Sequence, residues 1–423
     1  MNYPDSVEFL YALGNEIKTA KLGLERMAAV LEALGRPQDR CRLVHVAGTN
    51  GKGSTSAMIA AGLRAAGLRT GLFTSPHLSQ PTERIRIQDV PLSREAFAAA
   101  FDSVHAVVEE LLRRGVIDFH TTYFETVTAM ALETFAREAE IAVLEVGLGG
   151  RLDATNVVHP ELCLVTPIDF DHEAYLGRSL EAIAGEKAGI LKRGVPAVFA
   201  RQRPEALRVL EDRAASLGIP VTRTADWSIE DLELDARGSR FQLTGPRRLR
   251  IRCPLGGEHQ VENAIAAAAA LDALAIPSTA IEAGIAAARW PGRLELVRER
   301  PEIILDGAHN PAGARALAAY IARFYSGRRV HLIFGAMRDK AVEEVGGILF
   351  PHAVEVIATA PRQARALAPE AIMHACDHSS MRAVSGIEEA LALVADVPPE
   401  DVVFVTGSLF LVAEARDILV GAP

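Results

Sequence analysis

The sequence predicts an α/β protein in which a parallel-sheet domain with a small antiparallel subsheet precedes a second, Rossmann-like α/β domain. Three observations indicate this fold class. Over the first ~290 residues, apolar β-branched segments alternate with helical segments, as in parallel sheets covered by helices on both faces. Residues 227–254 instead show short alternating strands joined by turns. After a Pro–Gly pair at residues 291–292, a second series of strand and helix segments begins.

The elements of the first series follow one another in a regular order. An apolar-periodic helix over Ser54–Ala66 follows the first strand, and Asn263–Leu274 resumes helix after the antiparallel segment. Turns within that segment are expected at Ala236–Gly238 and Gly245–Pro246, where Gly and Pro interrupt the pattern. The candidate parallel strands are Leu43–Ala47, Gly71–Thr74, Ile141–Val146, Leu162–Pro167 and Ala197–Ala200.

The second series begins after the break at Trp290–Arg293, and each of its strands is followed by a helical stretch. This part of the chain is long enough to form a core of its own. We therefore expect two domains, residues 1–292 and residues 293–423. The candidate strands of the second domain are Glu302–Leu305, Val330–Phe334, Val354–Thr359, Met381–Val384 and Val402–Thr406.

The composition argues against several classes of protein. A net charge of −9 over 423 residues disfavours a broad nucleic-acid or anionic-membrane surface. Residues 1–10 lack the features of a secretory signal, and the longest alanine-rich run, Ala264–Leu271, is far shorter than the roughly 20 residues of a membrane helix. The four cysteines are widely scattered, which fits a reducing compartment. We therefore expect a cytoplasmic protein that binds neither nucleic acid nor membranes.

A glycine-rich turn joins the first strand to the helix that follows it. Its glycines let backbone N–H groups face a phosphate, the helix directs its positive dipole end at the same point, and Lys52 adds a cation. Because Gly53 follows the lysine, a metal-binding hydroxyl would come from Ser54, Thr55 or another loop. The pattern predicts a P-loop ATPase domain, and a tight turn without a ligand is the alternative. The expected nucleotide-binding residues are Gly48, Thr49, Asn50, Gly51, Lys52, Gly53, Ser54 and Thr55.

Polar side chains gather where three strands of the first domain end. Ser75 follows one strand, Glu145 lies near the end of the next, and Asp169, Asp171 and His172 follow a third. Ligands of open parallel sheets bind at these carboxyl ends. A hydroxyl, a carboxylate and an imidazole beside a phosphate loop predict a Mg²⁺ site completed by nucleotide oxygens and water. A salt-bridged strand end and a structural histidine are the alternatives for the single residues.

Further polar residues indicate a site between the two domains. Asp306 and His309 follow a strand of the second domain, and Ser408 follows its last strand, where a helix N-terminus can receive a carboxylate. Arg293 at the break is either a clamp over phosphates or a hinge residue. Clefts between domains are preferred ligand sites. Lys187 lies between small residues on an expected helix, where the pattern leaves surface charge and function open.

These residues resemble the folylpolyglutamate synthase/dihydrofolate synthase family within the Mur ligase group. The similarity extends over nearly the whole chain. Its most specific segments are Glu145–Asn156, with the sequence EVGLGGRLDATN, and Asp306–Pro311, with the sequence DGAHNP. A glycine-rich turn alone would be a weaker match.

The resemblance implies a role for each matching residue. For Mg²⁺ it implies Ser75, Glu145, His172 and Lys187, the lysine carrying a carbamyl group that helps to hold a second metal. For ATP, beyond the glycine-rich turn, it implies Asn263, Arg293 and Asp306. For the incoming glutamate it implies His309 and Ser408. For the pterin-bearing acceptor it implies Leu22, Gly23, Leu24, Arg84, Tyr123, Phe124, Asp153 and Ala154.

The implied activity is ATP-driven addition of L-glutamate to tetrahydrofolate through an acyl phosphate. Phosphoryl transfer converts a poor acyl donor into one whose phosphate departs readily, while the protein positions the reactants and stabilises moving charge. The implied catalytic residues are Lys52, His172, Lys187 and His309. Members that also make dihydrofolate from dihydropteroate often carry an aspartate before the segment that begins at Leu22. This chain has Lys21 there, which favours polyglutamylation.

Two other interpretations stay open at this point. One is a Mur-type or other ATP-dependent amino-acid ligase with a different acceptor, and the other is a P-loop switch that binds nucleotide without ligating anything. Because water would hydrolyse an acyl phosphate, the second domain is expected to close over the cleft. Members of the family are usually monomeric. We therefore expect a monomer whose partners are ATP, L-glutamate and a folate or dihydropteroate.

Overall fold

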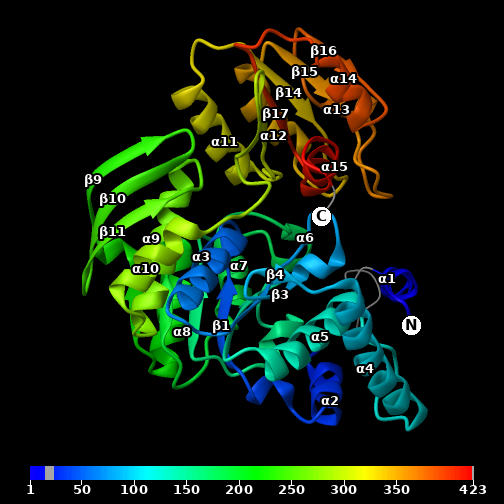
Figure 1. The fold of residues 1–423 in the computed structure, drawn as a ribbon, viewed down its shortest axis with the longest axis vertical. Coiled ribbons are helices and arrows are strands. Elements are labelled where there is room, and N and C mark those ends of the chain that lie inside the picture. The colour runs from blue at the N-terminus through cyan, green and yellow to red at the C-terminus, as the bar shows by residue number, and fades with distance from the viewer. Residues whose placement is uncertain (15–22, 422–423) are drawn as a thin grey trace.

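The computed structural model describes residues 1–14 and 23–421 (Figure 1). Its strands form an eight-stranded, a three-stranded and a six-stranded sheet. The six-stranded sheet, near the C-terminus, lies above the other two in Figure 1, and the three-stranded sheet lies beside the helices α9 and α10. The expected α/β class, with a small antiparallel sheet and a second α/β unit, is confirmed.

The eight-stranded sheet has the order β4-β3-β2-β5-β1-β6-β7-β8. Its centre is the parallel trio of β5, β1 and β6, in which Val46 is level with Glu145 and Ala47 with Val165. The carboxyl ends of these strands therefore lie along one edge. The strands are β1 Arg42–Ala47, β2 Thr70–Phe73, β3 Ile85–Ile87, β4 Val90–Pro91, β5 Ile141–Glu145, β6 Leu162–Val165, β7 Ala197–Phe199 and β8 Val221–Arg223.

Side chains of β1 alternate between two cores, as expected for a strand covered on both faces. Val44 and Val46 pack against α3, α9 and α10, whereas Leu43 packs against α2, α4 and α5. None of the described helices combines the length and apolar character that crossing a membrane requires. The helices of this part are α1 Tyr3–Ala12, α2 Glu25–Ala33, α3 Lys52–Ala65, α4 Arg94–Arg113, α5 Tyr123–Glu138, α6 Glu173–Leu176, α7 Leu180–Ala188, α8 Pro204–Leu217, α9 Glu258–Ala273 and α10 Ser278–Ala287.

All five parallel strands predicted for this sheet are present, with ends shifted by a residue or two. The predicted helix at 54–66 begins already at Lys52, because Gly51 enters it in the left-handed region at φ 84°. Helix α9 begins at Glu258 rather than at Asn263. Its first turn is polar, so the spacing of apolar residues does not show where the helix starts. Strands β3, β4 and β8 were not predicted. They are two or three residues long. Strands β4 and β8 are the edge strands of the sheet and β3 lies next to β4, so little apolar patterning is required of them.

The antiparallel segment forms a three-stranded sheet, as predicted. Alternate residues of its strands, including Phe241, Leu243, Leu249 and Ile251, are buried in the core shared with α9 and α10. The turns fall where they were expected, between β9 and β10 and between β10 and β11. The strands are β9 Ser228–Asp235, β10 Gly238–Thr244 and β11 Arg248–Cys253.

The six-stranded sheet has the order β12-β13-β17-β14-β15-β16 and is parallel except for β12. All five predicted strands are present. Strand β12 was not predicted, because it is half-exposed and rich in charge. The strands are β12 Glu295–Glu299, β13 Glu302–Leu305, β14 Val330–Phe334, β15 Glu355–Ala358, β16 Met381–Ala383 and β17 Val402–Thr406. The helices are α11 Pro311–Phe324, α12 Val342–Leu349, α13 Pro369–Ala375, α14 Ile387–Leu393 and α15 Leu409–Leu419.

The close packing of α3 on α10 yields a test of the fold. A Cβ added to Gly284 of α10 would overlap the backbone of Gly62 in α3. Because backbone cannot move aside as a side chain can, Gly284→Ala should lower the free energy of unfolding by about 1–3 kcal/mol in urea titrations. The matched change Gly185→Ala lies in α7 with open space around it and should raise stability by up to ~1 kcal/mol. Equal effects of the two changes would contradict this packing.

Candidate active site

A cavity of about 560 Å³ lies between the carboxyl edge of the eight-stranded sheet and the second α/β unit. The glycine-rich turn lines one wall, and residues that follow β13 line the opposite wall. Most residues expected to bind nucleotide, metal or glutamate meet in this cavity. Its lining includes Gly48, Thr49, Asn50, Gly51, Lys52, Gly53, Ser54, Ser75, Glu145, His172, Lys187, Asn263, Arg293, Asp306 and His309.

The glycine-rich turn is anchored to the segment after β6. The hydroxyl of Thr49 donates to the carbonyl of Asp169 at 3.0 Å, and the Asp169 amide donates back to that hydroxyl at 3.1 Å. The amides of Thr49 and Asn50 both donate to the Pro167 carbonyl, at 3.0 and 3.3 Å. Gly51 fits directly against Asn263, whose side-chain amide a Cβ would overlap. Two neighbouring segments therefore fix the shape of the turn.

Two lysine ammonium groups converge on one carbonyl of this turn. The Nζ of Lys52 donates to the Gly48 carbonyl at 3.1 Å and to that of Thr49 at 3.0 Å. The Nζ of Lys187, from α7, donates to the same Gly48 carbonyl at 2.9 Å. Lys187 is 4% exposed, and burial, with a further contribution from Lys52, lowers its pKa to about 7. Burial also lowers the pKa of Lys52. The wall is thus rich in positive charge and suited to an anion.

Glu145 faces this positive wall from the end of β5. It is 4% exposed, and burial raises the pKa of its carboxyl to about 7. The hydrogen bond that it accepts from the Ser75 amide is long, at 3.3 Å. A buried carboxylate with so little hydrogen bonding gains much from a bound cation. Together with the Ser75 hydroxyl and the His172 imidazole, it forms a donor set that fits Mg²⁺.

Asp171, in the segment after β6, is contacted by side chains from both units. Lys340 donates to it at 2.8 Å, and the Nε2 atoms of His172 and His309 lie 3.9 and 3.8 Å from its oxygens. Burial alone would raise the pKa of Asp171, but Lys340, and the two imidazoles at the low pH where they are protonated, hold it well below its usual range. Burial lowers the pKa of both His172 and His309 to about 4, so both rings are neutral near pH 7. Neutral imidazoles are able to ligate metal or accept a proton.

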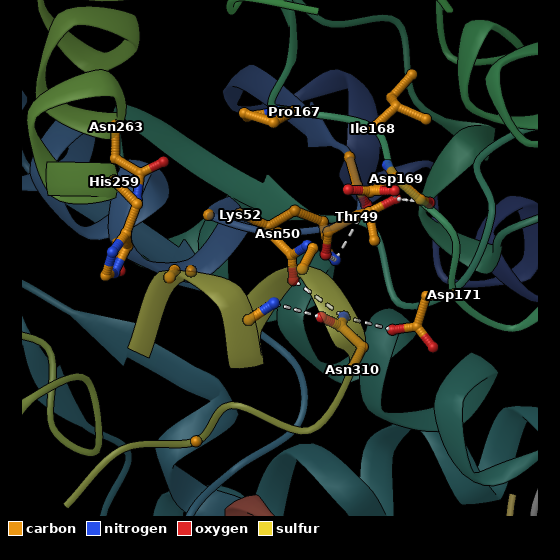
Figure 2. A pocket seen from close by; sticks show the side chains of 18 of the residues that line it. Thr49, Asn50, Lys52, Pro167, Ile168, Asp169, Asp171, His259, Asn263 and Asn310 are labelled. Atoms are coloured by element: carbon orange, nitrogen blue, oxygen red, sulfur yellow. Dashed lines mark hydrogen bonds between the residues drawn. The ribbon is translucent and has the colours of Figure 1, made fainter. Parts of the chain in front are cut away.

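Asn310 joins the two walls of the cavity (Figure 2). Its Nδ2 donates to Oδ1 of Asn50 at 3.1 Å and to Oδ2 of Asp171 at 3.0 Å. Its Oδ1 accepts from the Gly313 amide at 2.8 Å and so caps α11. One side chain therefore starts a helix of the second unit and binds two loops of the first.

Arg293 and Asp306 lie where the chain passes into the second unit. Both oxygens of Asp306 accept backbone amides, from Leu294 and Ala308 at 3.0 Å each. Burial raises the pKa of this carboxyl and lowers the pKa of the Arg293 guanidinium. Arg293 donates to the carbonyl of Gly292 at 3.0 Å, and its remaining donors are available to a ligand in the cavity.

Several residues expected at the site do not line this cavity in the described part of the chain. Asp153 accepts from the amides of Gly147 and Leu148, at 3.0 and 2.8 Å, and so shapes the glycine-rich loop after β5. Thr55 is buried inside α3, and Ser408 caps α15. Gly23 and Leu24 precede α2, whereas Leu22 and Lys21 lie outside the described residues.

A second group of these residues forms an aromatic and basic cluster near the loop after β2. Arg84 lies over the ring of Tyr123 at 5.1 Å and donates to Nδ1 of His77 at 2.8 Å. Tyr11 stacks on Tyr123, with ring centroids 5.7 Å apart. Phe124 packs against Gly147, and Ala154 is buried in the same core. Through Phe124, this cluster contacts the loop after β5.

The sequence analysis missed Lys340. It lies in the loop after β14, at the same edge of its sheet as Asp306 and Ser408. The strand-end rule that identified those two residues also applies to this loop. The segment RDK stood out less because charged triplets are common in surface loops.

Comparisons with known proteins agree with the fold. The Mur ligase middle domain matches residues 46–271, and the Mur ligase glutamate ligase domain matches residues 292–409. Folylpolyglutamate synthase from Lacticaseibacillus casei is 35% identical, covering 100% of this chain and 99% of its own. Dihydrofolate synthase/folylpolyglutamate synthase from Bacillus subtilis is 36% identical, covering 94% of each chain. A solved Mycobacterium tuberculosis folylpolyglutamate synthase complexed with ADP and AMPPCP has a TM-score of 0.93 at 33% identity, over 100% of both chains.

The fold and the site thus define a Mur ligase. Within that class, the chain belongs to the folylpolyglutamate synthase/dihydrofolate synthase family, and the resemblance drawn from its motifs is confirmed.

The contact between Lys340 and Asp171 yields a test of the joint between the two units. Both side chains are 12% exposed. Lys340→Met leaves Asp171 buried with one cation fewer, which should lower the free energy of unfolding by about 3 kcal/mol in urea titrations and raise the radius of gyration in small-angle scattering. Arg315→Met breaks a contact with Asp169 that is 3.5 Å long, with an arginine that is 53% exposed, so its cost should stay below ~1 kcal/mol. An equal, small effect of both changes would contradict the role of Lys340.

Proposed function

We propose that this chain is an ATP-dependent ligase that adds L-glutamate to tetrahydrofolate, a folylpolyglutamate synthase. The observation that carries the proposal is the cavity in which Lys52 and Lys187 share the Gly48 carbonyl and the buried Glu145 lies at the end of the neighbouring strand. Positive groups and an under-bonded carboxylate at the same edge of the sheet suit a nucleotide with its metal ions. The relatives named above and the complexes of one of them with ADP and AMPPCP support this assignment.

In this proposal the glycine-rich turn binds the phosphates of ATP. Amides of residues 48–55 and the N-terminus of α3 would face the phosphate oxygens, and Lys52 would exchange its carbonyl contacts for the phosphate chain. Asn263, Arg293 and Asp306 would bind the rest of the nucleotide. We assign residues 1–292 to the ATP-binding domain and 293–423 to the glutamate-ligase domain, since the change from one sheet system to the next falls between them.

Ser75, Glu145 and His172 would hold Mg²⁺. When bound, Mg²⁺ neutralises part of the phosphate charge and so assists phosphoryl transfer. Lys187 has a pKa of about 7, so an appreciable fraction of its amine is neutral near that pH. A neutral amine can attack CO₂, forming a C–N bond and releasing one proton. The carbamate made in this way would add oxygens for a second metal ion.

The acceptor carboxylate would attack the γ-phosphorus of ATP and release ADP. The amine of glutamate would then attack the acyl carbon, and phosphate would leave as the amide forms. Lys52 and Arg293 would stabilise the charge that develops on the moving phosphoryl group. His309, neutral near pH 7, would orient the glutamate amine or take its proton, and Ser408 would lie near the glutamate carboxylate.

The pterin-bearing acceptor would lie toward the aromatic and basic cluster. Tyr123 and Arg84 offer a ring and a guanidinium on which a heterocycle can stack. The remaining residues assigned to this part are Leu22, Gly23, Leu24, Phe124, Asp153 and Ala154. Dihydrofolate synthesis from dihydropteroate is the second candidate activity, since the Bacillus subtilis relative carries both names.

We also propose that the chain acts in the cytoplasm as a monomer whose partners are small molecules. Residues from both ends of a single chain complete the cavity, so the site needs no second copy.

A panel of acceptors tests the activity. Purified protein with ATP, Mg²⁺ and labelled glutamate should incorporate label into tetrahydrofolate. Incorporation into dihydropteroate would establish the second activity, whereas incorporation into a UDP-muramoyl peptide alone would assign the chain to a different kind of Mur ligase. ADP formation independent of every acceptor would support a nucleotide switch and overturn the proposal.

Substitution of the cradle lysine tests the nucleotide site. Lys52→Met keeps the size of the side chain and removes its charge, so kcat/KM should fall by at least ~10²-fold while circular dichroism is unchanged. Arg315→Met removes an exposed cation nearby and should keep kcat/KM within about fivefold of the parent value. A near-normal rate for Lys52→Met would contradict the assignment of Lys52 and the glycine-rich turn to phosphate binding.

A further inference from the structure

Two histidines and a glutamate form a cluster away from the cavity. His105 and Glu109 lie one turn apart on α4, and His120 lies in the connection between α4 and α5. One potential ligand atom from each residue lies within 4.8 Å of the other two. None of the three residues lines the cavity described above. The cluster therefore calls for an explanation of its own.

Aromatic packing holds both imidazoles in place. The ring of Phe9, from α1, meets His105 edge-on at 4.7 Å and lies 5.4 Å from His120. Phe101, one turn before His105 on α4, stacks on His105 at 5.3 Å. The ring centroids of His105 and His120 lie 5.7 Å apart. Three neighbouring elements thus preorganise the pair of rings.

The hydrogen bonds of His120 direct a lone pair into the cluster. Its Nδ1 lies 2.9 Å from the Thr121 carbonyl and 3.2 Å from the Thr121 hydroxyl. Because the carbonyl oxygen only accepts, the shorter of these hydrogen bonds requires the proton of the neutral ring on Nδ1. Nε2 then presents a lone pair, and it lies 3.9 Å from Oε1 of Glu109. A lone pair facing a carboxylate oxygen is unfavourable unless a proton or a metal ion lies between them. A backbone hydrogen bond that fixes the tautomer in this way is typical of metal-ligating histidines.

Two ring nitrogens of the cluster have unmet bonding capacity. Nδ1 of His105 and Nε2 of His120 are both inaccessible to solvent, and neither has a hydrogen-bond partner among the described residues. Leaving such an atom without a partner costs about 1–3 kcal/mol, so each case in a native structure needs a reason. A single ion between the rings would satisfy both nitrogens and the glutamate.

We propose that His105, Glu109 and His120 bind a divalent transition-metal ion of the Zn²⁺ type. Two imidazole nitrogens and one carboxylate oxygen form a ligand set that suits Zn²⁺, whereas Mg²⁺ and Ca²⁺ prefer oxygen ligands alone. In a tetrahedral site the ligand atoms lie about 3.3 Å apart, for metal–ligand bonds of ~2.0–2.1 Å. The ligand atoms lie within 4.8 Å of one another, so small rotations of both rings and of Glu109, which is 56% exposed, would bring them to this spacing.

The ion would connect α4 to the chain just before α5. His120 lies two residues before Thr122, whose side chain accepts from the Glu125 amide and caps α5. Glu125 in turn pairs with Arg26 of α2 at 2.8 Å. Bound metal would therefore restrain the connection at 114–122 and the start of α5, without touching the nucleotide cavity. The proposed role is structural, and zinc binding can be tested without measuring ligation.

The direct test is zinc binding to the full chain. Crystals soaked in ZnCl₂ should show an anomalous difference peak between these three side chains. Titration of Zn²⁺ in excess Mg²⁺ should show one site whose affinity falls more than ~100-fold in His105→Ala and His120→Gln, since loss of a supporting partner alone costs roughly 10–100-fold. Limited proteolysis at 114–119 should slow when zinc is added to the parent protein and stay unchanged in the variants.

A matched pair of surface changes keeps the test decisive if a histidine variant fails to fold. Glu109→Gln should weaken zinc binding by about tenfold, whereas Glu110→Gln, on the adjacent helix position, should leave it unchanged. Unaltered ligation rates in Glu109→Gln without zinc would show that the fold is intact. A zinc peak found only in the nucleotide cavity, or equal affinity in Glu109→Gln and Glu110→Gln, would overturn the proposal and leave the cluster as aromatic packing.

Discussion

The sharing of one backbone carbonyl by two buried ammonium groups is the constraint around which the structure is organised. Lys52 and Lys187 come from different helices, α3 and α7, and both donate to Gly48. Burial lowers the pKa of each, and the charge of Lys52 lowers the pKa of Lys187 further. Burial raises the pKa of Glu145 to about 7. A bound anion would stabilise the two ammonium groups, and a bound cation would stabilise the Glu145 carboxylate. The cavity is therefore suited to a ligand that brings both charges.

The scaffold keeps these charges at fixed positions through close packing of the backbone. A Cβ at Gly48 would overlap the side chain of Thr166, and one at Gly53 would lie 2.8 Å from the indole nitrogen of Trp290. The turn therefore fits against β6 and against the chain that leads into the second unit. Both contacts need glycine for space, and Gly51 needs it for its left-handed backbone as well. Close packing within the protein therefore requires these glycines, in addition to any requirement for phosphate binding.

The sequence predicts the buried elements well because burial imposes a pattern on them. The central parallel strands and the antiparallel sheet are covered by helices, so their apolar period is visible. Strands β4, β8 and β12 lie at sheet edges and β3 lies next to one, so their residues are covered less and show little apolar alternation. In the site, Glu145, His172 and Asp306 were predictable from the ends of strands. The convergence of Lys187 on Gly48 was not, because 139 residues separate the two atoms and only the stacking of α7 brings them together.

The two walls of the cavity are joined by polar groups rather than by an apolar interface, and this has a mechanical consequence. Asn310 binds Asn50 and Asp171, and Lys340 binds Asp171. Hydrogen bonds of this kind can be exchanged for bonds to a ligand or to water at small net cost, because each contributes only about 0.5–1.5 kcal/mol. An apolar seam of the same extent would resist opening far more strongly. Because Asn310 also caps α11, any movement of that helix changes the contacts of Asn50 beside the phosphate-facing turn. The position of the second unit and the shape of the cavity are therefore coupled through a single side chain.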